Sequence, residues 1–253
     1  MTRHRRTREK IHSVLLSGLA IAVALVAPKP APAQDATSTY ASMAPLEEYL
    51  MDRDAEIALA RSAAPDAISR DASVVVLTRH GYETAVHGTN GWVCWVGRGW
   101  MAMFDHPEFW NPKVRAADCL NPPAGRSVLP YAYKRAELIL AGRSKLEVIA
   151  GIKAAIDKKE LPALEPGALS YMMSKSSYLT DSGGHNAPHL MFFESEKNDA
   201  AWGTNLTNSP VLAVNYWYIS DLYPQLKSFP PLFVFLVVVD KWSDGTPVGK
   251  HQE

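Results

Sequence analysis

The sequence lacks the two short motifs that would point most directly to a common enzyme class. It has no Gly-x-Ser-x-Gly elbow, which places the nucleophile of many serine hydrolases, and no glycine-rich loop of the kind that cradles phosphate groups. It also has no internal repeat, and no low-complexity tract beyond residue 44. Any activity must therefore be sought in less specific groupings of side chains.

The apolar run near the N-terminus is too short to span a membrane. It extends over 14 residues, from Val14 to Ala27, whereas a spanning helix needs about 20. It follows five basic residues and precedes Ala31-Pro32-Ala33, a small-x-small site, in the order typical of a secretory signal. We therefore predict a signal peptide over residues 1–33, cut after Ala33, that meets the membrane only during export. An uncleaved membrane anchor is the alternative, because Pro32 lies inside the cleavage site.

The expected mature chain has no excess of basic charge. Removing residues 1–33 takes six basic residues and one acidic residue from 26 of each, which leaves 20 basic and 25 acidic residues and a net charge of −5. Binding to a phosphate backbone needs a basic surface, so we expect no nucleic-acid partner. We expect a periplasmic or secreted protein whose partner is a small molecule or another protein.

Cysteine is scarce, with Cys94 and Cys119 as the only two. An isolated pair in an oxidising compartment is most simply explained as one disulfide. Closing a loop of about 25 residues would contribute on the order of 3 kcal/mol of stability. A reactive thiol is the alternative, but Cys94 lies within the apolar run GWVCWVG, which disfavours a thiolate.

Hydrophobic patterns predict a flexible lead over residues 34–44 and a single globular domain over residues 45–253. The segment between Pro45 and Pro65 has apolar residues at helical spacing and predicts an amphipathic helix. Three short strand-like segments follow: 73–78, 82–88 and 91–97. Because Asn90-Gly91 is a strong signal for a tight turn, we expect these segments to form an antiparallel meander.

The rest of the chain predicts an irregular segment, a helical hairpin and more strands. Residues 97–125 are rich in proline and aromatic residues and predict a packed loop. Two helices are expected over 127–142 and 144–161, the second beginning with Ser144 and Glu147 in capping-box spacing. Four strand-like segments complete the chain: 168–174, 189–194, 210–219 and 232–240.

The last of these segments, 232–240, is an unbroken apolar run, which predicts a strand buried on both faces at the centre of the sheet. The fold class we expect is α+β. It combines an antiparallel or mixed β-sheet with the helical hairpin and the N-terminal helix packed on one side.

Arg79-His80-Gly81 follows the first strand-like segment. This tripeptide resembles the opening of the histidine phosphatase superfamily, and the resemblance implies His80 as a nucleophile with Arg79 beside the substrate phosphate. In that family the tripeptide ends the first strand of a parallel sheet, whereas here two more antiparallel strands are expected. We therefore favour a hairpin bend at Gly81 and keep a histidine phosphatase-like enzyme as an alternative.

The loop 181–194 supplies the candidate catalytic residues Asp181, His185 and His189. Two histidines four residues apart have zinc-ligand spacing on a helix, but the glycines and Pro188 here predict a turn that leads into a strand. A loop can still gather ligands, so a metal- or histidine-dependent hydrolase with a divalent metal is one alternative. A third ligand would come from Asp181, His87 or His106. The simpler interpretation is a polar loop whose histidines bond to the backbone.

A third group, Asp105, His106 and Glu108, lies in the irregular segment. Carboxylates beside a histidine can perform acid–base chemistry, although a solvated loop is the simpler interpretation. The seven tryptophans could line a ligand cleft, but aromatic residues on strands more often belong to the core.

Four segments together carry a resemblance to known proteins: GTNGWVCWVGR, KRAELILAGRSKLE, YMMS and PHLMFF. They resemble a group of exported bacterial proteins with no known activity, over roughly residues 71–244. The resemblance places Asn90-Gly91, Cys94, Pro188 and His189 on the wording that the group shares, and it implies no activity or cofactor. We therefore expect an exported binding or structural domain without catalysis, and leave open whether the protein is an enzyme.

Overall fold

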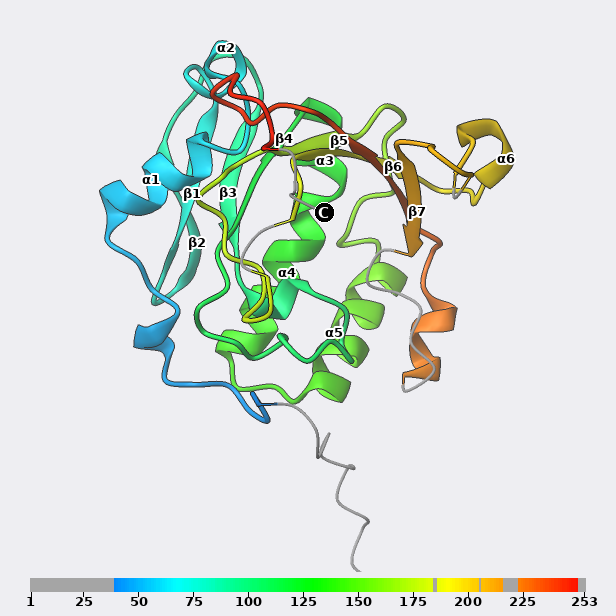
Figure 1. The fold of residues 1–253 in the computed structure, drawn as a ribbon. Helices are drawn as coiled ribbons and strands as arrows, with labels where there is room; N and C mark the ends of the chain where they lie inside the picture. The colour runs from blue at the N-terminus through cyan, green and yellow to red at the C-terminus, as the bar shows by residue number, and fades with distance from the viewer. Residues whose placement is uncertain (1–38, 184–185, 205, 216–222, 250–253) are drawn as a thin grey trace, which may run out of the picture. The chain divides into compact units, whose positions relative to one another are not determined.

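The computed structural model describes residues 39–183, 186–204, 206–215 and 223–249. These residues form an eight-stranded sheet in the order β2-β1-β3-β4-β5-β6-β8-β7 (Figure 1). The strands are β1 (Ser73–Thr78), β2 (Gly81–Val86), β3 (Val93–Gly97), β4 (Ala116–Leu120), β5 (Leu169–Met172), β6 (His189–Glu194), β7 (Val211–Asn215) and β8 (Phe233–Val238). The α-helices are α1 (Arg53–Arg61), α2 (Asp66–Ser69), α3 (Pro122–Ser127), α4 (Leu129–Leu140), α5 (Lys145–Asp157) and α6 (Asp199–Trp202). Short 3₁₀ helices are η1 (Leu46–Glu48), η2 (Gly99–Met101) and η3 (Pro224–Ser228).

The sheet is mixed, which confirms the expected α+β class. Strand β1 pairs in parallel with β3, and the other pairings are antiparallel. The predicted hairpin bend after β1 is present, with Gly81 at a φ of 117°. Within the described part of the chain, no helix has the length and apolar character needed to cross a membrane.

The predicted antiparallel meander is wrong at its third strand. After β2 the chain returns across the beginning of β1, and β3 then pairs with β1 rather than with β2. Asn90 does not form a hairpin turn. Its side chain instead bonds to the backbone at this crossing. Its amide nitrogen donates to the Ile68 carbonyl (2.7 Å), and its Oδ1 accepts from the Trp92 amide (3.0 Å).

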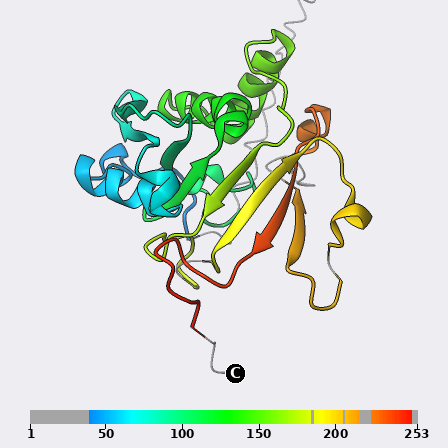
Figure 2. The ribbon, with the colours of Figure 1, turned by 90° about the horizontal axis from the view of Figure 1, so that it is seen from above.

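Helices lie on both faces of the sheet, so the prediction that they pack on one side is wrong. Neighbouring strand residues point to opposite faces. Cys94 of β3 packs in one buried cluster with Ala60 of α1, whereas Trp95 packs in a second cluster with Ala132 of α4. In Figure 2 the blue α1 and the green α4 and α5 lie on opposite sides of the strands.

The disulfide between Cys94 and Cys119 is present and confirms that prediction. The two cysteines are directly opposed on β3 and β4, with their Cα atoms 4.0 Å apart. Both are fully buried in the cluster beneath α1. The disulfide therefore ties together the two strands at the middle of the sheet on that face.

The predicted N-terminal helix is divided into two pieces. It consists of η1 and α1, because Asp52 begins a new helix as its N-cap and accepts hydrogen bonds from the amides of Asp54 and Ala55. Between the pieces, the buried Tyr49 donates its hydroxyl to the Trp110 carbonyl (2.7 Å). The break thus anchors the chain to the long segment that follows β3.

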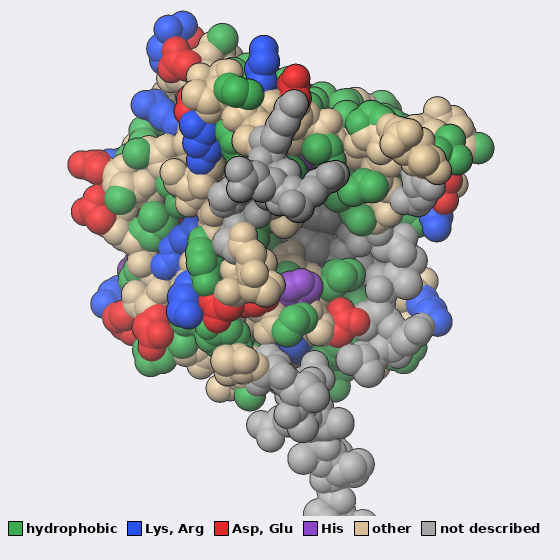
Figure 3. Space-filling model, viewed as in Figure 1, with side chains coloured by type: hydrophobic (Ala, Val, Ile, Leu, Met, Phe, Trp, Pro, Cys, Tyr) green, Lys and Arg blue, Asp and Glu red, His purple; other side chains and the backbone are tan. Residues whose placement is uncertain are grey.

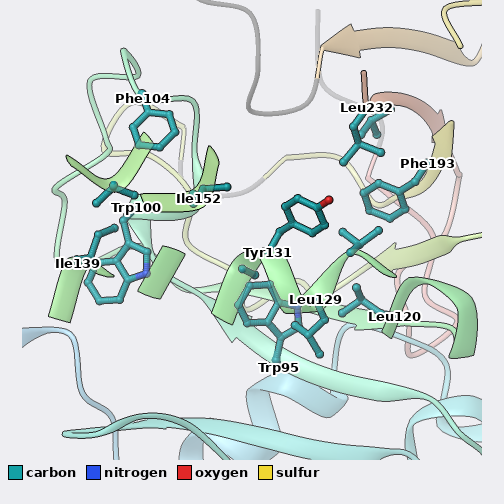
Figure 4. Close-up of a cluster of buried hydrophobic side chains, with 14 of the residues drawn as sticks. Trp95, Trp100, Phe104, Leu120, Leu129, Tyr131, Ile139, Ile152, Phe193 and Leu232 are labelled. Atoms are coloured by element: carbon teal, nitrogen blue, oxygen red, sulfur yellow. The ribbon is translucent and has the colours of Figure 1, made fainter. Parts of the chain in front are cut away.

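The helical hairpin of α4 and α5 is confirmed. Ser144 and Glu147 form the predicted capping box, and Gly142 adopts a φ of 73° between the two helices. The hairpin covers the cluster that contains Trp95, Leu120 and Phe193, which Figure 4 shows between the helices and the strands.

The apolar strand near the C-terminus does not lie at the centre of the sheet. β8 is next to the edge strand β7, and its end at Val238 is 39 % exposed. Unbroken runs of four buried residues lie instead in β1, β3 and β4. An apolar run therefore predicted a strand correctly but not its place.

Candidate functional site

A cavity of about 270 Å³ opens on the sheet face that also carries α4 and α5. Its wall combines residues of β3, β4, β5 and β6 with the segment after β3 and the loop before β6. Most of the lining surface is apolar, and its larger apolar side chains are Trp95, Met101, Val114, Met172, Leu179 and Met191. Figure 3 shows a face of the molecule that is hollowed near its centre. An apolar cavity with a few polar groups is the usual form of a small-molecule site.

Asp118 is the acidic side chain that β4 contributes to this cavity. It is 7 % exposed and lies directly opposite Trp95, whose Nε1 donates to Asp118 Oδ2 at 3.4 Å. The second carboxyl oxygen, Oδ1, is buried without a hydrogen-bond partner among the described residues. The Ser170 hydroxyl on β5 lowers the pKa of this carboxyl. The Ser170 oxygen is also buried and has no well-aligned hydrogen-bond partner among the described residues. Buried polar atoms are normally paired, so Asp118 Oδ1 is open to a further hydrogen bond.

Burial raises the pKa of Asp118 to about 7, and the nearby Ser170 hydroxyl, Trp95 indole and Cys119 amide, in that order, offset only part of this effect. No neighbouring charge contributes to the shift. The carboxyl therefore changes its protonation state near neutral pH, which is the range in which a side chain can donate or accept a proton readily.

Glu108 and His106, from the segment after β3, are two further polar residues that line the cavity. Glu108 Oε1 accepts from the Thr180 hydroxyl (2.8 Å), and Oε2 accepts from the Asn111 amide (2.5 Å). The Glu108 backbone amide donates to His106 Nδ1 (3.2 Å), which leaves Nε2 to carry the proton of a neutral ring. Of the third predicted group, His106 and Glu108 thus line the cavity, whereas Asp105 does not.

Asp181 has a different environment from the one a catalytic acid needs. It is exposed, and it accepts hydrogen bonds from the hydroxyls of Tyr178 and Tyr40 and from Lys113 Nζ (3.3 Å). These hydrogen bonds, from Tyr178 first and then Tyr40, hold the pKa of Asp181 well below its usual range. Asp181 therefore links the N-terminal lead to the loop before β6.

His189 begins β6 and is 7 % exposed. Burial lowers its pKa, although a hydrogen bond between Nδ1 and the Ala187 carbonyl (2.8 Å) partly opposes this shift. No hydrogen bond or ion pair joins it to Asp181, and the described residues hold no cluster of three metal-ligating side chains. The predicted partner His185 lies outside the described residues. The hydrolase hypothesis therefore stays a prediction.

The Arg79-His80 pair lies at an exposed hairpin turn and does not line the cavity. Arg79 forms an ion pair with Glu47, and the His80 amide donates to the Thr78 hydroxyl (3.1 Å). These contacts give both residues a structural role at the turn. Among the described residues, no hydrogen bond or ion pair joins His80 to a cationic side chain.

Sequence reasoning missed Asp118, the residue on which the site depends. The sequence predicts an irregular segment over 97–125, whereas Ala116–Leu120 within it forms the central strand β4. A signal was present, since an acidic residue interrupts an otherwise apolar AADCL run beside a cysteine that we assigned to a disulfide. Acidic side chains are rarely fully buried without a functional or structural reason.

Comparison of the chain with family models, with curated proteins and with solved structures found no match. The site must therefore be interpreted from its own chemistry.

Proposed function

We propose that the protein is an exported domain that binds a small, largely apolar molecule in the cavity at Asp118. The basic segment and short apolar run at the N-terminus support export, as does a disulfide between its two cysteines. The proposal extends the expectation of a binding domain by giving the ligand a place in the fold.

One observation carries the proposal. The apolar lining surrounds a buried carboxyl whose Oδ1 has no partner among the described residues. Leaving such an atom unpaired costs about 1–3 kcal/mol in a folded protein. A ligand that fills the cavity and bonds to Oδ1 would remove this penalty, which is the arrangement found in sites that bind small molecules.

The test uses N-phenyl-1-naphthylamine, an uncharged apolar dye whose emission rises in apolar surroundings. Leu179→Trp adds volume to the cavity wall, and Leu206→Trp makes the same change at a side chain that is 67 % exposed. We expect the wild type and Leu206→Trp to bind the dye with similar affinity, and Leu179→Trp to bind it at least about 10-fold more weakly. Circular dichroism would confirm that both variants are folded. Equal dye binding by Leu179→Trp would refute the proposed site.

A further inference from the structure

The cavity contains acidic groups without basic partners. Glu108 is 9 % exposed and Asp118 is 7 % exposed, and both line the same cavity. Neither side chain forms an ion pair with any described residue. Buried carboxyl groups that ionise are normally paired with a cation. In this cavity no described side chain forms such an ion pair with Glu108 or Asp118, so a bound ligand would have to supply the positive charge.

Arg98 also lines the cavity, but its charge is paired with Glu56. Its Nη2 donates to Glu56 Oε2 (2.8 Å), and its Nε and Nη1 donate to the carbonyls of Tyr49 and Val96. Both members of this ion pair are almost fully buried, at 1 % and 0 % exposure. The charges of Arg98 and Glu56 thus cancel each other, and Arg98 does not pair with Glu108 or Asp118.

We propose that the ligand of this cavity is a small organic cation, an amine carried on an apolar or aromatic body, with Asp118 as its counter-ion. The inference rests on the proposed function and narrows its ligand class. The ammonium group would donate to Asp118 Oδ1, the atom without a partner. The apolar body would pack against Trp95, Met172 and Met191, and an indole face beside a cation adds a further attraction.

The affinity for an uncharged ligand that accepts a hydrogen bond from protonated Asp118 should depend on pH in the opposite way. A cation needs the ionised carboxylate, so its binding strengthens as pH rises through about 7, whereas a neutral acceptor binds more weakly. The titratable groups that also line the cavity are Arg98, His106 and Glu108, all from the segment after β3. Strands β3, β5 and β6 contribute Trp95, Met172 and Met191 to it, which do not titrate.

The test compares 2-phenylethylamine with 2-phenylethanol, a neutral ligand of nearly the same shape, by isothermal titration calorimetry at pH 5 and pH 8. The amine stays protonated at both values. We expect wild-type protein to bind the amine at least about 10-fold more tightly at pH 8 than at pH 5, and more tightly than the alcohol at pH 8. Asp118→Asn should lose about 10-fold or more in amine affinity and most of its pH dependence. Asp71→Asn, a change at an exposed carboxyl, should behave as the wild type.

Two results would overturn the inference in different ways. If the alcohol binds as well as the amine, or the amine does not bind while the dye still does, the cation class is wrong and the proposed function stands. If the wild type binds neither the two ligands nor the dye, the proposed function fails as well. Glu108→Gln adds a separate check, because a cation held by both carboxyls should also bind this variant more weakly.

Discussion

Trp95 and Asp118 are direct neighbours across β3 and β4, and the indole Nε1 donates to Asp118 Oδ2 at 3.4 Å. This contact fixes one oxygen of the carboxyl and leaves Oδ1 without a partner among the described residues. Both side chains lie on regular strands rather than on loops. The base of the cavity is therefore held by the sheet, which is how a fold positions a binding group accurately.

We predict that Asp118→Asn stabilises the protein at pH 8. The pKa of Asp118 is raised to about 7 by burial, above its value in the unfolded chain. The wild type therefore loses stability as pH rises from about 4 through about 7, by up to about 4 kcal/mol, whereas asparagine cannot ionise. The variant should be more stable than the wild type at pH 8 and close to it at pH 4. Urea denaturation across this pH range measures the difference.

The control for this experiment is Asp71→Asn, which makes the same change at an exposed carboxyl. Its difference from the wild type should be small and nearly constant over the same pH range, because surface changes away from specific contacts usually alter stability by less than about 0.5 kcal/mol. A stability difference between Asp118→Asn and the wild type that does not vary with pH would show that Asp118 ionises normally.

We predict that replacing both cysteines with alanine destabilises the protein by about 3 kcal/mol. The disulfide joins Cys94 and Cys119 across β3 and β4 and closes a loop with a sequence separation of 25. A reductant should lower the stability of the wild type by a similar amount and leave the double variant unchanged. Guanidinium denaturation with and without dithiothreitol measures both effects. A double variant as stable as the oxidised wild type would argue against a structural role.

Local signals in the sequence were enough to predict the elements that depend on local interactions. The α4–α5 hairpin follows from Gly142 and from the capping box of Ser144 and Glu147, all within six residues. The parallel pairing of β1 with β3 was not predictable in this way. It depends on a backbone crossing between residues 71–73 and residue 88, which no periodicity in either segment encodes.

The candidate site was only partly predictable for a related reason. His106 and Glu108 are recognisable in the sequence as an acid–base group, but Asp118, which lines the same cavity, lies on a short strand that the sequence predicts as a loop. The sequence pairs His189 with His185 by their spacing and adds Asp181 as a possible third ligand. In the fold, one is fixed by two tyrosines at the surface and the other by the Ala187 carbonyl. Sequence spacing therefore identified polar residues but not the environment that decides their chemistry.

We predict that Arg98→Met destabilises the protein by about 3–5 kcal/mol, because it leaves the Glu56 carboxylate buried without its cation. Adding Glu56→Gln should restore part of this loss, since the glutamine carbonyl can still accept from the Leu77 amide, as Glu56 Oε1 does at 3.0 Å. The free energy of unfolding of the two single variants and the double variant measures the coupling. Additive effects of the two substitutions would contradict a direct interaction between these charges.

We predict that Gly88→Ala is strongly destabilising, whereas Gly125→Ala is not. A Cβ atom on Gly88 would lie 2.2 Å from the Ser73 backbone nitrogen and 2.4 Å from the Asp71 carbonyl oxygen, where the chain crosses the beginning of β1. Relief of this overlap must move backbone, so we expect a loss of about 2 kcal/mol or more.

The matched position, Gly125, lies in α3, and a Cβ there would meet Val93 Cγ2 at an ordinary 3.5 Å. Alanine favours a helix over glycine by about 1 kcal/mol, so Gly125→Ala should be neutral or stabilising. Thermal and urea denaturation of the two variants measure the contrast. Similar stability of both variants would mean that the backbone at the crossing beside β1 has room for a Cβ atom. The close approach of Gly88 to residues 71–73 would then not be needed for the parallel pairing of β1 with β3.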